Sequence, residues 1–561
     1  MTFYNINIGI LGHVDAGKTL LAKKLSTTSS TASFDKSRQS QERKITLDLG
    51  FSQRFIPIPP QMEEICQELG FEKIQLTFVD CPGHSSLIKT IVGGSQIIDY
   101  VLMVIDANKG IQTQTSEGFI LSELSTKNLL IVINKTDTIP SEKYEKRMIN
   151  LKKHIRRALK PTSFHNSPIV EVSAFKDQGI DTLLEQLSAT IQFPPRINLL
   201  LNKKLKESQV KPFFMNVDHC FLLRGKGTIL TGTILSGIVK VGDMIEIPSK
   251  NVTKQVKSMQ VFRKDVKTAR EGDRVGIRIV KFDASTFERG VVCAPNSVPT
   301  FTAAIINIQK IPYFKLPIAS KKIKFTVMVG HVSSMASLIL FQEKSINTNV
   351  KEKEKEKEKE KEKEKEKEKE KEKEKEKEKE KEKEKEFEDE KKKEKFDFLK
   401  EYEYVQSIEG KKKILNTYAL LEFAKPITCP LGSLLIGGRF DLPSKPPMCR
   451  LSFHGKIIHT FENLNENLSS VIKIYKTKTK KGKITRIADK RVVIVSELFN
   501  KNSDIGRYTS KVLLIGNDRN IKGVILRAFG KTGKIKVQID SGTDNIQIGT
   551  PVFLLIKKFI D

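Results

Sequence analysis

Cysteines are few in this 561-residue chain: six are scattered along it, and none forms a C-x-x-C pair. This spacing favours neither a disulfide framework nor a zinc ribbon, so we expect reduced thiols. Long apolar runs are absent too, since no stretch approaches the roughly 20 residues that cross a bilayer. The first motif starts at residue 12, which leaves no room for a secretory or transit segment. We therefore expect a cytoplasmic protein.

The formal net charge of +31 is unevenly distributed. The tract from Lys351 to Glu386 consists of 18 strict Lys-Glu pairs that sum to zero, and we interpret it as a solvated insertion. The segment from Lys473 to Asp561 holds 20 Lys and Arg residues against seven Asp and Glu residues, a net charge of +13. This density favours a polyanionic partner. Stacking aromatics are sparse there, however, so a merely soluble basic face stays open as the alternative.

The length allows roughly three to four domains. Up to residue 192, β-branched runs alternate with helical stretches such as Glu142 to Leu159, which predicts an α/β domain with a doubly wound, mostly parallel sheet. Beyond Pro194-Pro195, short apolar runs punctuated by glycines predict three β-barrel domains. We expect domains at residues 1–192, 197–298, 299–470 and 471–561, with the low-complexity insertion at about 343–412.

The most informative positions, Gly12 to Thr19, complete the pattern G-x-x-x-x-G-K-[ST] directly after an apolar run. A strand that turns through glycines into a helix presents consecutive backbone N–H groups to phosphate oxygens. In this pattern Lys18 reaches the β- and γ-phosphates, and the Thr19 hydroxyl ligates Mg²⁺. We therefore predict a P-loop in which Gly12, Asp15 and Gly17 also contact the nucleotide.

The segment Asp80-Cys81-Pro82-Gly83-His84 follows the apolar stretch Ile74 to Val79. At the end of a strand, the Asp80 carboxylate can hold the Mg²⁺ shell, and the Gly83 N–H can sense a γ-phosphate. This is the second motif that a guanine-nucleotide switch requires, and it comes in the required order.

Two further motifs predict which base is bound. Asn134-Lys135-Thr136-Asp137 follows an apolar run, and its Asp137 carboxylate can accept hydrogen bonds from guanine N1–H and the exocyclic amine, which adenine does not offer. Ser173-Ala174 follows the run from Ile169 to Val172 and offers a backbone N–H to the guanine oxygen. We therefore predict GTP or GDP, with Mg²⁺, as the ligand.

A GTPase domain followed by two β-barrels is the plan of translational elongation factors. The chain resembles more closely the selenocysteine-specific elongation factors of eukaryotic or archaeal type, along nearly its whole length outside the Lys-Glu tract. The segments that carry this resemblance are Ser26 to Lys36, Ile45 to Phe51, Val217 to Phe221, Arg224 to Thr228, Thr231 to Gly237, Gly272 to Arg274 and Glu288 to Pro295.

The resemblance implies a GTPase that delivers selenocysteinyl-tRNA to the ribosome at recoded UGA stop codons, with ribosome-stimulated hydrolysis as the release timer. It further implies contact of the basic last domain with selenocysteine insertion element RNA, directly or through a binding protein. We expect a monomer that binds no membrane.

The family's aminoacyl pocket maps, by resemblance, onto Phe51, Asp218, His219 and Arg274. A selenol is a stronger acid than a thiol or a hydroxyl and is ionised at neutral pH, so a pocket that prefers it to serine should be cationic. Arg274 and His219 fit this need. By the same resemblance Asp218 orients the two cations, and Phe51 closes the pocket from the switch segment.

The hydrolytic residues are likewise implied by the resemblance. His84 corresponds to the residue that orients the attacking water, and Thr46 to the second Mg²⁺ hydroxyl of the switch. Val14 and Ile45 correspond to an apolar gate that restrains the histidine. The family's Arg-Gly-Ile-Thr is replaced here by a sequence with Lys44, which leaves the switch geometry open.

Three other readings of the sequence compete with this one. A generic aminoacyl-tRNA carrier would not need the basic fourth domain, and an initiator-tRNA carrier of similar plan would be expected to show a zinc ribbon. A non-hydrolysing GTP-gated RNA-binding protein would use the same fold only as a scaffold, against which His84 speaks.

Overall fold

The computed structural model describes residues 3–29, 49–82, 92, 97–201, 211–223, 225, 227–320, 323–343, 396–409, 416–442, 449–464, 471–530, 532–540 and 546–560. The chain forms two compact units. The first unit contains Met1–Ile339 and Ser407–Asn463, and the second contains Leu340–Gln406 and Leu464–Asp561. The Lys-Glu tract lies outside the described residues.

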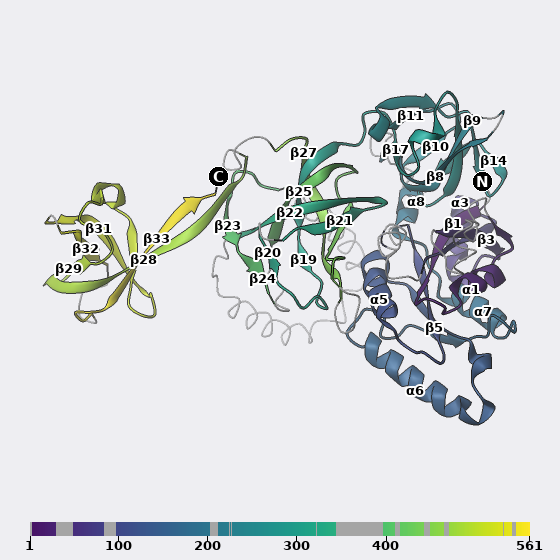
Figure 1. Ribbon diagram of the computed structural model, residues 1–561, viewed down its shortest axis with the longest axis horizontal. Helices are drawn as coiled ribbons and strands as arrows, with labels where there is room; N and C mark the ends of the chain where they lie inside the picture. Colours follow the sequence, from purple (N-terminus) through teal and green to yellow (C-terminus); the bar gives the residue numbers. More distant parts are fainter. Residues whose placement is uncertain are drawn as a thin grey trace, which may run out of the picture. The chain divides into compact units, whose positions relative to one another are not determined.

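The first domain of unit 1 is built on a seven-stranded sheet with the order β2-β3-β4-β1-β5-β6-β7 (Figure 1). The strands from β4 to β7 in this order are parallel, whereas β3 runs antiparallel to β4. The strands are β1 Phe3–Gly12, β2 Thr28–Ser29, β3 Gly50–Ile56, β4 Lys73–Asp80, β5 Tyr100–Asp106, β6 Leu129–Asn134 and β7 Ile169–Glu171, and the helices are α1 Lys18–Leu25, α3 Glu63–Leu69, α5 Thr113–Ser125, α6 Ser141–Leu159, α7 Ile180–Thr190 and α8 Asn198–Leu201.

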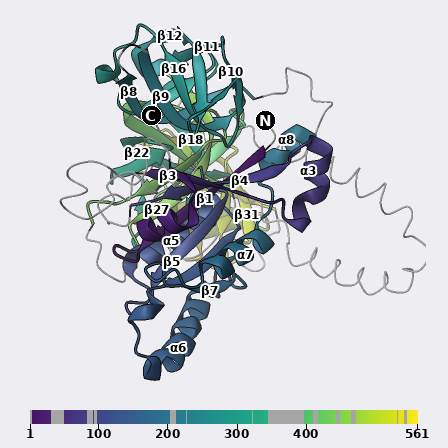
Figure 2. The ribbon, with the colours of Figure 1, turned by 90° about the vertical axis from the view of Figure 1, so that its right-hand side faces the viewer.

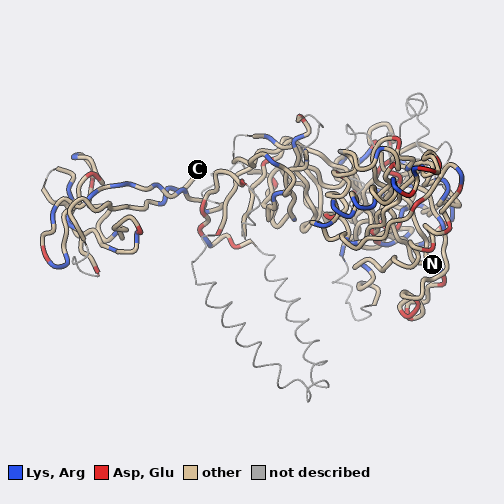
Figure 3. The backbone as a smooth tube through the Cα atoms, turned by 90° about the horizontal axis from the view of Figure 1, so that it is seen from below, with Lys and Arg blue, Asp and Glu red and all other residues tan. Residues whose placement is uncertain are grey.

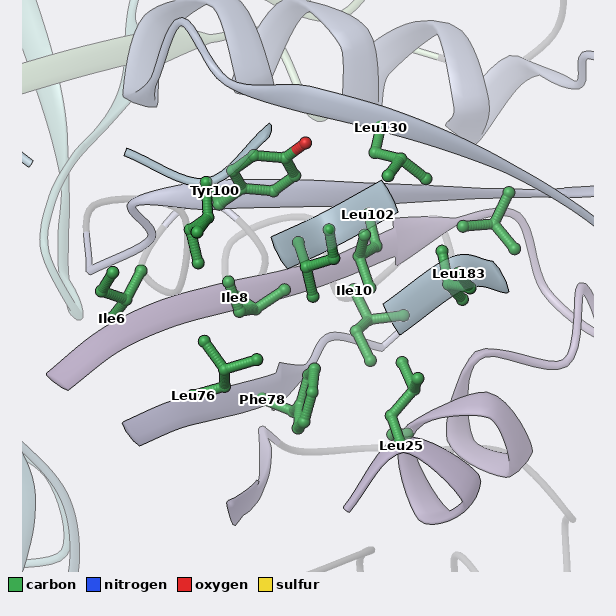
Figure 4. Close-up of a cluster of buried hydrophobic side chains, with 14 of the residues drawn as sticks. Ile6, Ile8, Ile10, Leu25, Leu76, Phe78, Tyr100, Leu102, Leu130 and Leu183 are labelled. Atoms are coloured by element: carbon green, nitrogen blue, oxygen red, sulfur yellow. The ribbon is translucent and has the colours of Figure 1, made fainter. Parts of the chain in front are cut away.

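Helices cover both faces of this sheet because its strands are apolar on both sides. Ile6, Ile8 and Ile10 of β1 are fully buried in one core, where they meet Leu25 of α1 and Leu183 of α7 (Figure 4). The opposite core contains the apolar stripe of α6, whose members lie three or four residues apart. That stripe consists of Met148, Leu151, Ile155 and Leu159. The predicted doubly wound α/β fold and the predicted helix over residues 142–159 are both confirmed.

The second domain is a half-barrel of eight strands in the order β12-β11-β17-β8-β9-β16-β13-β14, with β10 and β15 forming a separate pair. Figures 1 and 2 both show α6 at the far end of the first domain from these strands. The strands are β8 Phe214–Leu223, β9 Gly227–Ser236, β10 Ile238–Lys240, β11 Met244–Ile247, β12 Val252–Gln255, β13 Ser258–Val261, β14 Lys264–Val266, β15 Thr268–Arg270, β16 Arg274–Ile279 and β17 Gly290–Cys293.

The third domain is a closed barrel of six strands in the order β21-β26-β27-β18-β25-β22, which the pairing of β21 with β22 completes. It packs on α5, where the Arg450 guanidinium forms a buried ion pair with Glu117 at 3.0 Å. The strands are β18 Thr300–Asn307, β19 Gln309–Lys310, β20 Ile318–Ala319, β21 Phe325–Val329, β22 Val332–Glu343, β24 Ser407–Ile408, β25 Thr417–Thr428, β26 Leu434–Gly438 and β27 Leu451–Phe461.

Unit 2 contains a second closed six-stranded barrel, with the order β28-β29-β32-β31-β30-β33 and the pairing of β28 with β33. The long strands β28 and β33 continue as a ribbon, and β28 pairs in parallel with β23. The strands are β23 Glu401–Val405, β28 Lys473–Asp489, β29 Val492–Ser496, β30 Val512–Ile515, β31 Ile521–Phe529, β32 Lys534–Ile539 and β33 Pro551–Phe559. The prediction of β-rich domains after the α/β domain is confirmed.

Candidate functional site

The P-loop is the turn that joins β1 to α1. β1 ends at Gly12 and α1 begins at Lys18, so the loop leads directly into a helix N-terminus, where backbone N–H groups suit an anion. Gly12 and Gly17 have φ values of 144° and 86°, which favour glycine. A Cβ at Gly12 would collide with the Val104 carbonyl oxygen, and one at Gly17 would collide with Asn134 Nδ2. Close packing therefore requires both glycines.

Lys18 is held inside this turn. Its side chain is buried, and Nζ donates a hydrogen bond to the His13 carbonyl oxygen at 2.7 Å. Burial lowers the pKa of Lys18 below its usual value, and the nearby Asp80 only partly opposes this effect. A phosphate at the loop would supply the opposite charge that this buried ammonium group lacks. Asp15 lies in the same turn with a left-handed φ of 59°.

A hydroxyl and a carboxylate meet beside Lys18. Thr19 Oγ1 donates a hydrogen bond to Asp80 Oδ2 at 2.7 Å, and Asp80 is the buried last residue of β4. Both groups are hard oxygen ligands of the kind that Mg²⁺ prefers. Their convergence fits a Mg²⁺ ion bound next to the phosphates, with Thr19 and Asp80 as the residues that would hold it directly or through water.

The base-recognition residues lie at the ends of β6 and β7. Asn134 links them to the P-loop, because its Nδ2 donates to the Ala16 carbonyl oxygen at 2.9 Å and its Oδ1 accepts from the Ala174 N–H at 3.1 Å. The Ser173 hydroxyl donates to Asp137 Oδ1 at 2.6 Å, which orients the carboxylate predicted to bind guanine. The structure thus joins three of the predicted motifs into one site.

Asp106, at the end of β5, belongs to this site although the sequence analysis did not select it. Its carboxylate pairs with Lys135 Nζ at 2.9 Å. Burial opposes ionisation of Asp106, but hydrogen bonds from Lys135 and from the backbone N–H groups of Asn108 and Lys109 hold its pKa below the usual value. Its place as a carboxylate directly after a buried strand was the signal that could have revealed it.

The predicted aminoacyl pocket brings together Phe51, Asp218 and Arg274, which come from two domains. The Arg274 guanidinium forms an ion pair with Asp218 Oδ2 at 2.5 Å and lies 3.2 Å from the centre of the Phe51 ring. All three residues are buried. His219 follows Asp218 on β8 and is partly exposed, and its carbonyl oxygen accepts a hydrogen bond from Thr231 Oγ1 at 3.4 Å.

A cavity of about 760 Å³ opens beside this cluster in the second domain. Arg274 and Thr231 line it together with apolar residues that include Phe221, Ile229 and Met259. A buried guanidinium at the wall of an otherwise largely apolar cavity can attract an anionic group and exclude a neutral one. Gly83, His84 and Thr46, by contrast, lie outside the described residues, as do Lys44 and Ile45.

Comparison with protein families matches all four parts of the chain. The matching families are "Elongation factor Tu GTP binding domain" at residues 4–193, "Elongation factor Tu domain 2" at residues 227–294, "Selenocysteine-specific elongation factor, eukaryotes, 3rd domain" at residues 305–455 and "eEFSec C-terminal RIFT domain" at residues 470–551. The chain is also 38% identical to the selenocysteine-specific elongation factor of Mus musculus, over 96% of this chain and 88% of that protein.

The chain belongs to the selenocysteine-specific elongation factors. These are translational GTPases with a GTP-binding domain like that of elongation factor Tu, so the predicted family and enzyme class are confirmed. The selenocysteine-specific elongation factor of Methanocaldococcus jannaschii is 28% identical over 96% of this chain and 95% of that protein. A solved elongation factor of this family, from Methanococcus maripaludis in complex with the GTP analogue GppNHp, covers both chains fully with a TM-score of 0.67 and 25% identity.

The membrane prediction concerns helices alone. Among the described residues, no helix is both long enough and apolar enough to cross a bilayer.

Proposed function

We propose that this elongation factor delivers selenocysteinyl-tRNA to the ribosome at recoded UGA codons while it binds GTP and Mg²⁺. The observation that carries this proposal is the buried Arg274 guanidinium beside the second-domain cavity, paired with Asp218 and covered by Phe51. The adjacent His219 is the second candidate cation of the pocket.

The selectivity of the pocket follows from charge. The selenocysteinyl group is an anion at neutral pH, whereas a seryl group is neutral and of similar size. A guanidinium that is buried and already ordered by Asp218 stabilises the selenolate strongly, because a charge-assisted hydrogen bond in a site from which water is excluded is stronger than one in water. A seryl hydroxyl would gain far less from the same contact.

The test of this proposal is the variant Arg274→Ala. We expect the preference for selenocysteinyl-tRNA over seryl-tRNA to fall by roughly 10- to 100-fold, because one charged partner is lost. GTP affinity should not change, since Arg274 lies in another domain from the P-loop. The preference is measured as the ratio of the two dissociation constants, from protection of each aminoacyl bond against hydrolysis with GTP present.

Arg278→Ala is the matched control. Arg278 lies four residues farther along β16, also lines the cavity, and donates a hydrogen bond to Ser258 Oγ at 2.9 Å. The control removes a cation of the same kind without touching Asp218. An unchanged preference in Arg274→Ala, or an equal loss in both variants, would contradict the assignment and leave a generic aminoacyl-tRNA carrier as the better description.

We further propose that GTP hydrolysis times the release of the tRNA, with His84 orienting the water and Thr46 and Gly83 contacting Mg²⁺ and the γ-phosphate. This rests on the family membership and on the order of the motifs. The prediction is that His84→Ala abolishes ribosome-stimulated hydrolysis and leaves the affinity for GTP unchanged. Normal stimulated turnover in the variant would exclude the role and favour a nucleotide-gated binding protein without hydrolysis.

The proposed domains are residues 1–192, 197–298, 299–470 and 471–561. We propose that the last of these binds RNA, either the selenocysteine insertion element itself or, through a binding protein, its complex. The ribbon of β28 and β33 supports this, because exposed lysines line it (Figure 3). We also propose that the factor acts as a monomer in the cytoplasm.

A further inference from the structure

The turn that precedes Arg274 is attached to the GTPase domain. The Gly272 carbonyl oxygen accepts hydrogen bonds from Asn5 Nδ2 at 2.7 Å and from Asn7 Nδ2 at 3.0 Å. Both asparagines are buried on β1, although Gly272 belongs to the second domain. Two amide donors of one domain therefore converge on a single backbone acceptor of the other.

The asparagines are themselves held by their neighbours. Asn5 Oδ1 accepts hydrogen bonds from Thr77 Oγ1 at 2.6 Å and from Gln75 Nε2 at 3.0 Å, both on β4. Asn5 Nδ2 also donates to Asn7 Oδ1 at 3.0 Å. A buried polar network of this kind is costly unless its members are satisfied, and satisfaction makes it rigid. The network fixes the direction of the two amides that reach Gly272.

A guanidinium covers the same turn. Arg196 forms an ion pair with both oxygens of Asp99, and its Nη2 also donates to the Asn5 carbonyl oxygen at 3.0 Å. Asp99 in turn accepts a hydrogen bond from the Asn7 N–H at 2.8 Å. A Cβ at Gly272 would lie about 2.5 Å from the guanidinium carbon of Arg196. The contact is therefore possible only with glycine at this position.

The turn passes this constraint directly to Arg274. Gly272 N–H donates to the Ile234 carbonyl oxygen at 2.8 Å, and Ile234 N–H donates to the Asp273 carbonyl oxygen at 3.0 Å. The turn is thus fixed to β9 on one side and to β1 on the other, and Arg274 follows as the first residue of β16. A shift of the turn would move the guanidinium away from Phe51 and Asp218.

We propose that Asn5, Asn7 and Arg196 are positioning residues for amino-acid selection. By holding Gly272, they set the place of Arg274 across the boundary between the two domains. This inference rests on the proposed function, because the position of Arg274 matters for selection only if Arg274 recognises the selenocysteinyl group.

The chain provides a matched control turn. Gly242-Asp243 has the same construction as Gly272-Asp273: both glycines have positive φ, 101° and 93°, and both Asp carboxylates accept the N–H of the residue three positions earlier, at 2.7 and 3.0 Å. A Cβ at Gly242 would meet nothing within 4 Å. The variants Gly242→Ala and Gly272→Ala therefore impose the same backbone strain, but only the second disturbs the contact with the GTPase domain.

The experiment measures the ratio of dissociation constants for seryl- and selenocysteinyl-tRNA, with GTP, in the full chain carrying Gly272→Ala, Gly242→Ala, Asn7→Ala or Arg274→Ala. We expect Gly272→Ala and Asn7→Ala each to lower the ratio by roughly tenfold, as the loss of one ordered contact does. Gly242→Ala should keep the ratio of the unmodified protein. The thermal midpoint of each variant shows whether it is folded, and Asn7→Ala decides if Gly272→Ala is not.

Each outcome has a distinct meaning. If Arg274→Ala lowers the ratio but Asn7→Ala and Gly272→Ala do not, the positioning role is overturned and the proposed function stands. If Gly242→Ala lowers the ratio as much as Gly272→Ala, strain within the second domain explains the loss and the positioning role is overturned. If Arg274→Ala has no effect, the proposed function and this inference both fail.

Discussion

At the level of single residues, the nucleotide site is a set of side chains that already hold one another. Asn134 spans from the Ala16 carbonyl oxygen to the Ala174 N–H, and Ser173 holds the Asp137 carboxylate. A site whose groups are ordered before the ligand binds loses less entropy on binding. The backbone contact and the carboxylate that would read guanine are therefore fixed together.

The role of Asp137 leads to a prediction about the base. Asp137→Asn replaces an acceptor oxygen by an amide that donates, so both contacts to guanine are weakened. We expect GTP affinity to fall by on the order of 100-fold or more, because hydrogen bonds to a charged group contribute about 1.5–3 kcal/mol each. Titration of a fluorescent GTP analogue measures the affinity.

Ser173→Ala is the control for that variant. It removes the hydroxyl that orients Asp137 but leaves the carboxylate in place, so we expect a smaller loss, on the order of tenfold. If Asp137→Asn bound GTP as tightly as the unmodified protein, the assignment of the base-reading residue would be wrong.

Residues with a local signature could be predicted from the sequence, and residues with a long-range role could not. Lys18 and Thr19 follow from the spacing of one motif, and the structure places Thr19 against Asp80 as expected. Asn5 and Asn7 carry no motif, because their partner Gly272 lies more than 260 positions away. Only the packing of two domains gives these buried amides a purpose.

At the level of secondary structure, the strand β1, its glycine turn and the helix α1 act as one element. The turn is narrow because the chain must pass under Asn134 and beside β5, as the packing around Gly17 and Gly12 shows. Gly17 takes a left-handed conformation immediately before the helix. The element therefore depends on glycine for both conformation and space.

This dependence predicts a difference between two Gly→Ala variants. Gly70 ends α3 with a φ of 70°, and a Cβ there would meet nothing within 4 Å, so Gly70→Ala should cost only about 1 kcal/mol of unfolding free energy. Gly17→Ala adds a collision with Asn134 to the same backbone cost. We expect it to destabilise the protein more and to lower GTP affinity by on the order of 100-fold.

The measurements are the denaturant midpoint and the GTP dissociation constant of each variant. Equal midpoints and equal affinities for Gly17→Ala and Gly70→Ala would show that the contact with Asn134 is unimportant.

The order of the elements was more predictable than the way in which the sheets close. The apolar periodicity of residues 142–159 gave α6 within one residue, because the stripe that it buries is local. The difference between the half-barrel of the second domain and the closed barrel of the third depends on one pairing, that of β21 with β22, which joins neighbouring strands at the edge of the sheet. Short-strand patterns do not reveal such a closure.

At the level of the whole molecule, two β-rich domains of unit 1 each bring a buried arginine to the GTPase domain. Arg274 meets Phe51 of β3, and Arg450 meets Glu117 of α5. Because an isolated buried charge is costly, each arginine favours the arrangement in which its partner is present. The GTPase domain can therefore influence both β domains through contacts that are made or lost as a whole.

Unit 2 gives the last prediction, which concerns RNA. Lys476 and Lys558 lie opposite each other on β28 and β33, and Lys478 is two positions farther along the same face of β28. All three are exposed, and the Lys476 ammonium lies 4.0 Å from the centre of the Tyr404 ring. If RNA phosphates contact this face, each lysine replaced by glutamine should release fewer counterions, which lowers the dependence of affinity on salt by about 0.7–0.9 per contact.

The triple variant Lys476→Gln, Lys478→Gln, Lys558→Gln should therefore bind a selenocysteine insertion element hairpin more weakly, with a slope of log affinity against log salt that is about two units shallower. Gel-shift titrations of the full chain between 50 and 200 mM salt, the range over which such contacts are resolved, measure both quantities. The control replaces three exposed lysines elsewhere in unit 2, Lys501, Lys511 and Lys522, so the change in net charge is identical. A slope that changes equally in both triple variants would indicate binding by diffuse positive charge, and a slope that changes in neither would show that the phosphates are contacted elsewhere.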